Sequence, residues 1–382
     1  MPMFLPRLRY LGAAVLGLLL ATGGCGSRQA PSDHVQRDDA PVVAADWETA
    51  TPASQNLDPD LLAALLARVR DDSYKNIHGI LLVKNGKLVV EEYFPGRDSA
   101  GNPQSFGRDT LHETHSATKS VNGLLIGIAI DQGLIAGVDQ EISTFFPEYA
   151  DVFADKGKAA IRLKDCLSMT AGLSWDEVRP YTDPRNDHVA MNASADPLRY
   201  VLQQKLVAQP GTRFLYSSGV SIVLGEIIHK VSGLRADEFA QRHLFAPLGI
   251  REYHWQRYPN QLVQTGGGLS LRSRDMARIG SLVLNGGRWR GRQIVSETWI
   301  RESMKQQAPD AQYGYQWWLG QLGEPDRPVA AYGALGRGGQ FIIVLPDREM
   351  VAVFTGWNEG PLWEQPYDML KRYILPADAK TD

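Results

Sequence analysis

The stretch "HETHSATKSVNGLLIGIAIDQGL", residues His112 to Leu134, places Ser116 and Lys119 three residues apart, just before a long apolar run. Burying a lysine is costly unless its charge is matched or its proton is lost, and a lysine without that proton is a base. Residues three apart on a helix share one face, so the hydroxyl and the amine are expected within hydrogen-bonding reach at its first turn.

The same geometry favours a low pKa for Lys119, because apolar neighbours and the positive end of a helix both disfavour the ammonium. The start of a helix also leaves backbone N–H groups unpaired, and that of Ser116 is available to stabilise an oxyanion. The alternative is structural: Ser116 caps the helix and Lys119 points into solvent. Further motifs are needed to decide.

The bulk composition is that of a globular protein. The chain has 382 residues, 43% hydrophobic and 22% charged, enough for one large domain or two lobes. Its formal net charge is -3 and its sequence pI about 6.3. No basic field is present to hold nucleic acid or to draw the body of the protein onto anionic lipid, so we expect neither partner.

The N-terminus has the pattern of a bacterial export signal. Two arginines precede an apolar run, Leu11 to Ala21, that is too short to span a bilayer. We therefore predict a signal peptide over residues 1–24. "LATGGC" loosely resembles a lipobox, which predicts lipidation of Cys25; the alternative is ordinary cleavage nearby with no anchor. Residues 25–56 are polar and aperiodic and predict a flexible tether.

These features predict an exported, periplasmic protein whose one membrane contact is an N-terminal lipid. If Cys25 carries that lipid, Cys166 has no partner for a disulfide. Apolar residues at helical spacing surround Cys166, which favours an inert buried thiol over a nucleophile.

Strand patterns lie at the two ends of the remaining chain. Two apolar runs between His78 and Phe94 meet at Asn85-Gly86, a strong signal for a tight β-hairpin. A second hairpin pairs residues 341–345 with 350–354, and residues 313–320 make a plausible fifth strand. One five-stranded antiparallel sheet closed by both chain ends is therefore expected.

The middle of the chain is helical in pattern, with apolar residues spaced three to four apart. We expect a domain over residues 57–376, with a helical lobe of roughly 135–300 inserted in an α/β lobe, and a tail over 377–382. The expected helices are Val121–Asp131, Leu163–Met169, Pro197–Gln204, Val220–Val231, Ala236–Leu244, Ser273–Leu284, Ser296–Lys305 and about Trp363–Ile374. A cleft between such lobes is a common binding site.

Two later motifs strengthen the chemical interpretation. "PGTRFLYSSGVSIVLGEII", residues 210–228, sets Tyr216 after a turn and before an amphipathic helix, where its phenol can project into the cleft. "YGALGRGGQFIIVLP", residues 332–346, puts a glycine-rich corner at the start of a predicted strand, where backbone can approach a substrate closely.

In order and spacing, the three motifs resemble the serine β-lactamase and penicillin-binding superfamily. The closer likeness is to its class C branch, including family-VIII carboxylesterases and 6-aminohexanoate-dimer hydrolases. The resemblance implies a β-lactamase-like fold, of class α/β plus α. It also implies that Ser116 is the acylated nucleophile, that Lys119 is its general base, and that Tyr216 protonates the leaving group and then activates water.

The chain departs from the β-lactamase pattern at two positions. Ser218 stands where β-lactamases have the Asn of Tyr-x-Asn, so it offers no amide to a substrate. Arg337, Gly338 and Gly339 stand where they have Lys-Thr-Gly, although Arg337 keeps a positive charge that could hold a carboxylate. The backbone N–H of Gln340, next in line, is the expected second oxyanion donor, with Gly339 beside it.

A long irregular segment, residues 174–197, follows "TAGL", and loops of this length are usually functional or mobile. Its likeness to the amide-dimer hydrolases implies that Trp175 and Tyr181 line the acyl pocket; an exposed or core role for these aromatics is the alternative. Its acidic residues have the pattern of a solvated loop face rather than of a catalytic pair; they are Asp176, Glu177, Asp183 and Asp187.

Other chemistries fit less well. His112 and His115 have the wrong spacing for a His-Glu-x-x-His metal site, so we expect no metal, and His115 is expected to support the site or cap the helix. No Gly-x-Ser-x-Gly nucleophile elbow occurs in the sequence, and its glycine-rich stretches lack phosphate-binding fingerprints, so no cofactor is expected.

The sequence therefore predicts a serine hydrolase that cleaves a small ester or amide through an acyl-enzyme. Two alternatives stay open. One is a β-lactamase or D-alanyl-D-alanine carboxypeptidase, and the other is a non-catalytic protein that binds a cell-wall fragment.

Overall fold

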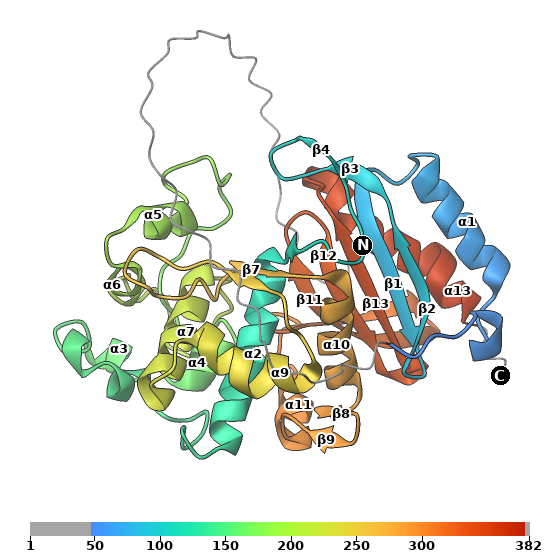
Figure 1. Cartoon of the computed structure of the whole chain (residues 1–382). Helices are drawn as coiled ribbons and strands as arrows, with labels where there is room; N and C mark the ends of the chain where they lie inside the picture. The colour runs from blue at the N-terminus through green and yellow to red at the C-terminus, as the bar shows by residue number, and fades with distance from the viewer. Residues whose placement is uncertain (1–46, 379–382) are drawn as a thin grey trace, which may run out of the picture.

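The computed structural model describes residues 47–378. Its centre is a six-stranded antiparallel sheet in the order β10-β11-β12-β13-β1-β2 (Figure 1). The strands are β1 (Ile77–Lys84), β2 (Lys87–Tyr93), β10 (Trp318–Glu324), β11 (Arg327–Gly336), β12 (Gln340–Leu345) and β13 (Met350–Gly356). Pairing of β1 with β13 joins the two ends of the chain and confirms the predicted closure of the sheet.

The first hairpin forms as its turn residues predict. Asn85 and Gly86 both have positive φ, 51° and 76°, as a two-residue turn between twisted strands requires. All eight residues of β1 are buried, because the strand lies inside the sheet and both of its faces are covered.

The predicted strand count was wrong by one, because β11 was missed. Its sequence, "RPVAAYGALG", consists largely of alanine and glycine with one proline, residues that are depleted in strands. Strand β10 also begins later than predicted, at Trp318 rather than Tyr313. The small residues of β11 have a structural purpose, because the strand runs directly against the segment that carries Ser116.

Helices cover both faces of the sheet (Figure 1). Helix α1 (Pro59–Arg70), which the sequence analysis had not identified, packs with the C-terminal helices on one face. The Asp58 side chain caps it by accepting hydrogen bonds from the backbone N–H groups of Asp60 and Leu61. Helix α10 (Ser273–Leu284), with the predicted bounds, packs against β12, β13 and β1 on the other face.

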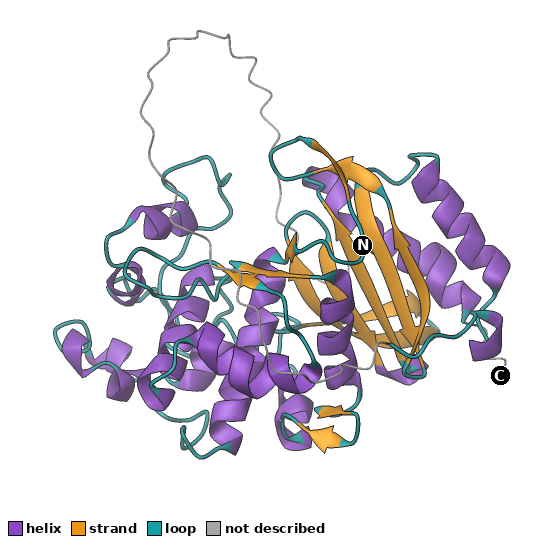
Figure 2. Cartoon of the chain, viewed as in Figure 1, coloured by secondary structure: helices purple, strands orange, loops and turns teal. Residues whose placement is uncertain are grey.

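The second lobe is mostly helical (Figure 2). Its central helix α2 (Thr118–Asp131) is buried over its first twelve residues and packs against α7 (Ser218–Ser232). The other helices of this lobe are α3 (Lys156–Ala159), α4 (Leu163–Leu167), α5 (Asp187–Ala193), α6 (Pro197–Leu202), α8 (Ala236–Ala240) and α9 (Ala246–Leu248). Helix α11 (Glu297–Ser303) follows α10 in the chain, and the C-terminal helices beside α1 are α12 (Gln365–Met369) and α13 (Leu375–Ala377). Short strands are β3 (Pro95–Arg97), β4 (Pro103–Ser105), β5 (His112–Glu113), β6 (His254–Trp255), β7 (Leu269–Leu271), β8 (Arg288–Trp289) and β9 (Arg292–Gln293).

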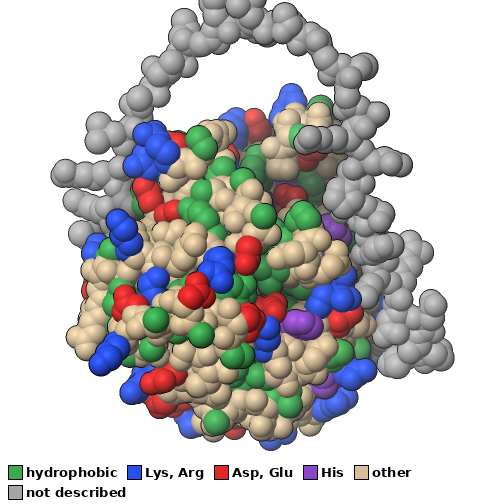
Figure 3. Space-filling view, turned by 90° about the vertical axis from the view of Figure 1, so that its left-hand side faces the viewer, with side chains coloured by type: hydrophobic (Ala, Val, Ile, Leu, Met, Phe, Trp, Pro, Cys, Tyr) green, Lys and Arg blue, Asp and Glu red, His purple; other side chains and the backbone are tan. Residues whose placement is uncertain are grey.

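Acidic and basic side chains lie interspersed over the face of the molecule in Figure 3, in keeping with the small net charge. Over residues 47–378, the helices are all too short or too polar to span a bilayer. The predicted signal peptide and Cys25 lie outside the described residues. Cys166 is buried, and burial raises the pKa of its thiol, as expected for an inert cysteine.

The predicted tether is wrong over residues 47–56, which pack on the domain. Trp47 is 9% exposed and meets Trp289 edge to face, with ring centroids 5.5 Å apart. The backbone N–H of Leu88 donates to Glu48 O at 2.8 Å, so this segment extends the pairing of β2. The domain also extends past residue 376, since Asp378 is buried and pairs with Lys84 at 2.9 Å.

Replacing Trp47 by alanine is expected to lower the free energy of unfolding by about 3 kcal/mol, because a large buried aromatic is lost. Urea denaturation measures the change. The control is Glu48→Ala, which removes an exposed carboxylate paired with Lys87 and is expected to cost less than about 1 kcal/mol. Equal stabilities of the two variants would show that the packing of Trp47 contributes nothing.

Candidate active site

Ser116 is held in place by a turn that is fastened to β7. It lies in a single 3-10 turn, His115–Ala117, immediately before α2. The backbone N–H of Thr114 donates to Leu269 O at 2.8 Å, and its hydroxyl donates to the same oxygen at 2.9 Å. His115 has a φ of +46°, a left-handed conformation that is uncommon for a non-glycine residue. The hydroxyl of Ser116 is therefore presented from a constrained backbone.

Lys119 is buried beside Ser116 and does not reach solvent. Its side chain lies in the first turn of α2, the residue is 1% exposed, and its Nζ is 3.0 Å from Ser116 Oγ. Nζ also donates to Ser218 Oγ at 2.9 Å and to Gly266 O at 2.5 Å. Burial lowers the pKa of Lys119 to about 8, against the opposing effect of the Glu177 charge. The solvent-exposed alternative for this lysine is thus contradicted.

Ser218 links Lys119 to a buried carboxylate. Its hydroxyl donates to Glu177 Oε1 at 2.6 Å, and its backbone N–H donates to Glu177 Oε2 at 2.8 Å. The Glu177 side chain is only 4% exposed. The sequence analysis had placed Glu177 on a solvated loop face, and that interpretation is wrong for this residue. Residue 218 offers no amide, as expected, and its hydroxyl is engaged within the site.

Tyr216 completes the group around Ser116. Its ring centroid is 5.0 Å from Lys119 Nζ, and its side chain shares a hydrogen bond with Ser116. The ring stacks on Trp318 at a centroid separation of 5.8 Å. Burial and the Glu177 charge raise the pKa of the phenol, so it keeps its proton at neutral pH. The three predicted catalytic side chains therefore converge.

Gln340, whose backbone N–H was the predicted second oxyanion donor, is not among the described residues that line the Ser116 cavity. It begins β12, is fully buried, and donates from its side chain to Gly356 O. The strand beside Ser116 is β11, which ends at Gly336. A Cβ atom on Gly336 would lie 2.1 Å from Thr114 O, so the two backbones are in direct contact. Arg337, the next residue, lines the cavity with Ser116.

The cavity at Ser116 has a volume of about 170 Å³. Polar side chains make most of its wall, including His115, Glu177, Tyr181, His188 and Gln264. This is smaller than the ~300–1,000 Å³ of sites that take drug-sized ligands.

Arg337 and Tyr181 form one rim of this cavity. The Arg337 guanidinium lies 4.7 Å from the Tyr181 ring centroid and 5.3 Å from that of Trp357, and it pairs with Glu359. Its charge is therefore already matched, which weakens the expectation that it holds a substrate carboxylate. Tyr181 lines the cavity as predicted, and its hydroxyl donates to Glu177 at 3.0 Å.

Trp175 and Gly339 do not belong to this wall. Trp175 is buried against α7, where its ring covers Gly219, and its Nε1 donates to Glu177 Oε2 at 2.7 Å. Gly339 lies in the turn between β11 and β12, outside the described lining of the cavity. The prediction that both meet substrate is not supported, because the loop folds inward at Trp175 and the turn folds away at Gly339.

The histidines near the site are neutral. Burial lowers the pKa of His115 and of His112 to about 4, and His112 Nε2 lies 2.7 Å from Nδ1 of the buried His78. Within residues 47–378, no three His, Cys, Asp or Glu side chains gather as a metal site. His115 lines the cavity.

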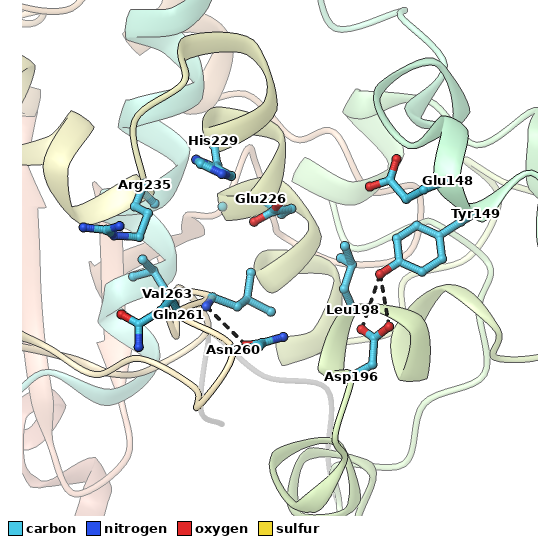
Figure 4. Close-up of a pocket in the computed structure, with 13 residues that line it drawn as sticks. Glu148, Tyr149, Asp196, Leu198, Glu226, His229, Arg235, Asn260, Gln261 and Val263 are labelled. Atoms are coloured by element: carbon cyan, nitrogen blue, oxygen red, sulfur yellow. Dashed lines mark hydrogen bonds between the residues drawn. The ribbon is translucent and has the colours of Figure 1, made fainter. Parts of the chain in front are cut away.

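A second cavity of about 230 Å³ opens in the helical lobe (Figure 4). Glu226 and His229 of α7 face it, together with Tyr149 and Asp196, whose side chains share a hydrogen bond of 3.2 Å. The two cavities have no lining residue in common. The second cavity is therefore separate from the Ser116 site, and substitutions in its wall can serve as controls.

The sequence analysis missed Glu177 and Gly266. Glu177 acquires its role from Ser218, which is 41 residues away, and Gly266 acts only through its carbonyl oxygen. The one hint in the sequence was the expected burial of Lys119, since a buried lysine calls for a matching charge nearby.

The fold and the paired side chains of Ser116 and Lys119 define a serine hydrolase. Residues 62–365 match the model of the Beta-lactamase family, and the chain therefore belongs to that family. It is 30% identical over 300 residues to the 6-aminohexanoate-dimer hydrolase of Paenarthrobacter ureafaciens, a match that covers 71% of each chain.

Two solved structures show the same fold. A penicillin-binding protein homologue from Caulobacter crescentus superposes with a TM-score of 0.65 at 19% identity, covering 84% of this chain and 98% of that one. A family VIII carboxylesterase superposes with a TM-score of 0.62 at 18% identity, covering 85% and 98%.

Proposed function

We propose that this protein hydrolyses a small ester or a short linear amide through an acyl-enzyme on Ser116. The observation that carries the proposal is the buried Lys119 Nζ, 3.0 Å from Ser116 Oγ. The 30% identity to a hydrolase of an amide dimer and the small cavity support the substrate class.

Acylation begins when neutral Lys119 takes the proton of the Ser116 hydroxyl. The freed electron pair on Oγ forms a bond to the carbonyl carbon of the substrate, and the carbonyl oxygen becomes an oxyanion. We assign its two donors to the backbone N–H groups of Ser116, at the start of α2, and of Arg337, at the end of β11. The contact between Gly336 and Thr114 O supports this pairing of donors.

Collapse of the oxyanion breaks the bond to the leaving group. Tyr216 donates its proton to the leaving oxygen or nitrogen and takes one from the Lys119 ammonium, so the net result is one proton moved from Ser116 to the leaving group, and Lys119 is neutral again. Water then attacks the carbonyl carbon of the acyl-enzyme while Tyr216 takes the water proton and passes its own to Lys119. Collapse of the second oxyanion breaks the bond between Ser116 Oγ and the acyl carbon, Lys119 returns a proton to Oγ, and the acid is released. The raised pKa of the phenol suits a residue that donates in one half-reaction and is reprotonated in the same step.

A substrate panel tests the proposal against its nearest rivals. We expect turnover of p-nitrophenyl acetate and butyrate and of a dimeric ω-amino amide, with rates that fall for long acyl chains because the cavity is small. A chromogenic cephalosporin is expected to react slowly, since the Ser218 hydroxyl is engaged with Lys119 and Glu177. Faster turnover of the cephalosporin than of the esters would favour a β-lactamase. Retention of ligands without any turnover would favour a binding protein.

The rate of Ser116 acylation is expected to rise with pH and to level off above about 8. Lys119 is a base only when it has lost its proton, so below its pKa of about 8 the rate falls about tenfold per pH unit. The other titratable groups that face Lys119 are displaced from this range. Glu177 is ionised, Tyr216 is protonated, burial lowers the pKa of His115 to about 4, and burial also lowers the pKa of His188.

Rate constants for fluorophosphonate labelling between pH 5.5 and 10 measure this profile. A single rise with its midpoint near 8 is expected. A midpoint near 6.5 would instead indicate a histidine base and would exclude Lys119 from that role.

We also propose that the protein is exported and anchored through Cys25, on the basis of the apolar run and the lipobox-like sequence. A membrane-bound protein that becomes soluble on Cys25→Ser substitution would agree with this. Unchanged partition of that variant would disprove the anchor.

A further inference from the structure

The orientation of the Lys119 amine follows from which of its neighbours can donate a hydrogen bond and which can only accept one. A lysine ammonium has three N–H donors and no acceptor, and the neutral amine has two donors and one lone pair. Lys119 Nζ has three oxygen neighbours: Ser116 Oγ at 3.0 Å, Ser218 Oγ at 2.9 Å and Gly266 O at 2.5 Å. Which neighbour faces the lone pair decides whether the amine can act as a base on Ser116.

Two of the three neighbours can only accept a hydrogen bond from the amine. The carbonyl of Gly266 has no proton to give. The Ser218 hydroxyl has one proton, and that proton is committed to Glu177, because an ionised carboxylate accepts and does not donate. The separation of 2.6 Å between Ser218 Oγ and Glu177 Oε1 is that of a strong hydrogen bond to a charged acceptor. Ser218 therefore presents a lone pair to Lys119.

We infer that Glu177, acting through the Ser218 hydroxyl, is a positioning residue that turns the lone pair of Lys119 toward Ser116. Both N–H bonds of the neutral amine are taken by Ser218 and Gly266, and the remaining lone pair faces the Ser116 hydroxyl. The inference rests on the proposed function, because it requires Ser116 to be the nucleophile. In many hydrolases a third group orients the base that activates the nucleophile, and here Glu177 is the third group for the base Lys119.

The surroundings of Glu177 keep its carboxylate fixed and charged. It accepts hydrogen bonds from Trp175 Nε1 at 2.7 Å, from the Tyr181 hydroxyl at 3.0 Å and from the Ser218 backbone N–H at 2.8 Å. Burial alone would raise the pKa of Glu177, but the charge of Lys119 and the hydrogen bonds from Ser218 lower it below its usual value. A group held by this many donors remains an acceptor throughout the reaction.

Glu177 and the Ser218 hydroxyl exchange no proton with Lys119 during the reaction. When Ser116 loses its proton, the new ammonium has three N–H bonds, of which Ser218 and Gly266 accept two. The third points toward Ser116 Oγ and Tyr216, to which Lys119 passes a proton in the next step. Glu177 keeps its charge and stabilises the ammonium.

A purely structural role for Glu177, as the counter-ion of a buried lysine, makes a different prediction. In that case Glu177→Gln lowers the stability of the protein, and the effects of substituting Glu177 and Ser218 on the labelling rate are independent of each other. A double-mutant cycle separates the two roles, because residues that act as one unit have non-additive effects on rate.

The experiment compares Glu177→Gln, Ser218→Ala and the double variant in the full chain. The control is Glu226→Gln, a half-buried glutamate of α7 that lines the second cavity. The readouts are the plateau rate constant of fluorophosphonate labelling at high pH and the midpoint of its pH profile. Labelling of the wild-type protein at Ser116 is measured first, and it tests the proposed function separately.

Each single variant is expected to lower the plateau rate constant about 10- to 100-fold, as expected when a base is present but misdirected. In Glu177→Gln, the new carboxamide can present an N–H to the Ser218 hydroxyl, which can then donate to Lys119 and draw its lone pair away from Ser116. The double variant should label within about threefold of the slower single variant. The pH midpoint should fall in Glu177→Gln, because the anion that raises the pKa of Lys119 is gone, and Glu226→Gln should match the wild type.

Effects that multiply in the double variant, or a Glu177→Gln profile with unchanged midpoint and plateau, would overturn the inference while leaving Ser116 as the nucleophile. If Glu177→Gln does not fold, Ser218→Ala tests the inference alone, since it removes only one hydroxyl. An unchanged labelling rate would overturn the inference. A rate at least tenfold lower, with unchanged thermal unfolding, would support it.

Discussion

Lys119→Ala is expected to acylate Ser116 about 10³-fold more slowly than the wild-type protein. The substitution removes the general base, and a positioned base contributes about 10²–10⁴-fold to such a step. Two neighbouring groups are poorly suited to replace it: Tyr216 keeps its proton, and the carboxylate of Glu177 is already engaged by hydrogen bonds from Trp175, Tyr181 and Ser218.

The measurement is the second-order rate constant for labelling by a fluorophosphonate at pH 9. Lys158→Ala is a matched control, because Lys158 is also buried, donates from Nζ to Leu202 O at 3.1 Å, and lies in the helical lobe away from the cavity. Its labelling rate should stay within about twofold of the wild type, in line with the small effects of substitutions away from a functional site. A Lys119→Ala variant that labels at the wild-type rate would remove the amine from the mechanism.

Gly336→Ala is expected to lower the acylation rate by about 10²-fold. A Cβ at this position would lie 2.1 Å from Thr114 O, a backbone atom that cannot rotate away, so β11 and the turn that bears Ser116 must separate. Loss of one oxyanion donor costs about 10²–10³-fold in other hydrolases, and a displacement near 1 Å costs about 10²-fold.

The control is Gly333→Ala in the same strand. Its new Cβ would meet only side-chain atoms of Leu335 and Ile343, at 3.0 Å or more, and these can adjust. A moderate change in stability with a nearly unchanged labelling rate is expected for Gly333→Ala. If both glycine variants label at the wild-type rate, the end of β11 supplies no oxyanion donor.

The parts of the site that were predictable from sequence depend on local geometry. Ser116 and Lys119 lie within one helical turn, so their spacing allowed a hydrogen bond between the two side chains, and the later motifs favoured it over a solvent-exposed lysine. The structure places Lys119 Nζ 3.0 Å from Ser116 Oγ. The Asn85-Gly86 hairpin and helix α10 follow equally from local turn and helix signals. Tyr216 was found through its order relative to the other motifs, and the structure brings it to Ser116.

The parts that were missed depend on contacts made by distant residues. Strand β11 has a sequence poor in strand-forming residues, and its pairing with β10 and β12 determines its conformation. Because the glycine-rich corner was read as the start of β12, Gln340 was predicted as the second oxyanion donor, whereas the residue of this corner that lines the Ser116 cavity is Arg337. Glu177 lies among charged loop residues, and only the folded chain brings Ser218 and Lys119 against it.

The central claim is that a neutral Lys119 activates Ser116 as the one nucleophile of this protein. Its most direct test is intact-mass spectrometry after incubation with a fluorophosphonate, followed by peptide mapping of the adduct. We predict a single adduct, located on Ser116 and absent from a Ser116→Ala variant. Labelling of any other residue at a comparable rate, or no labelling of the folded protein, would contradict it.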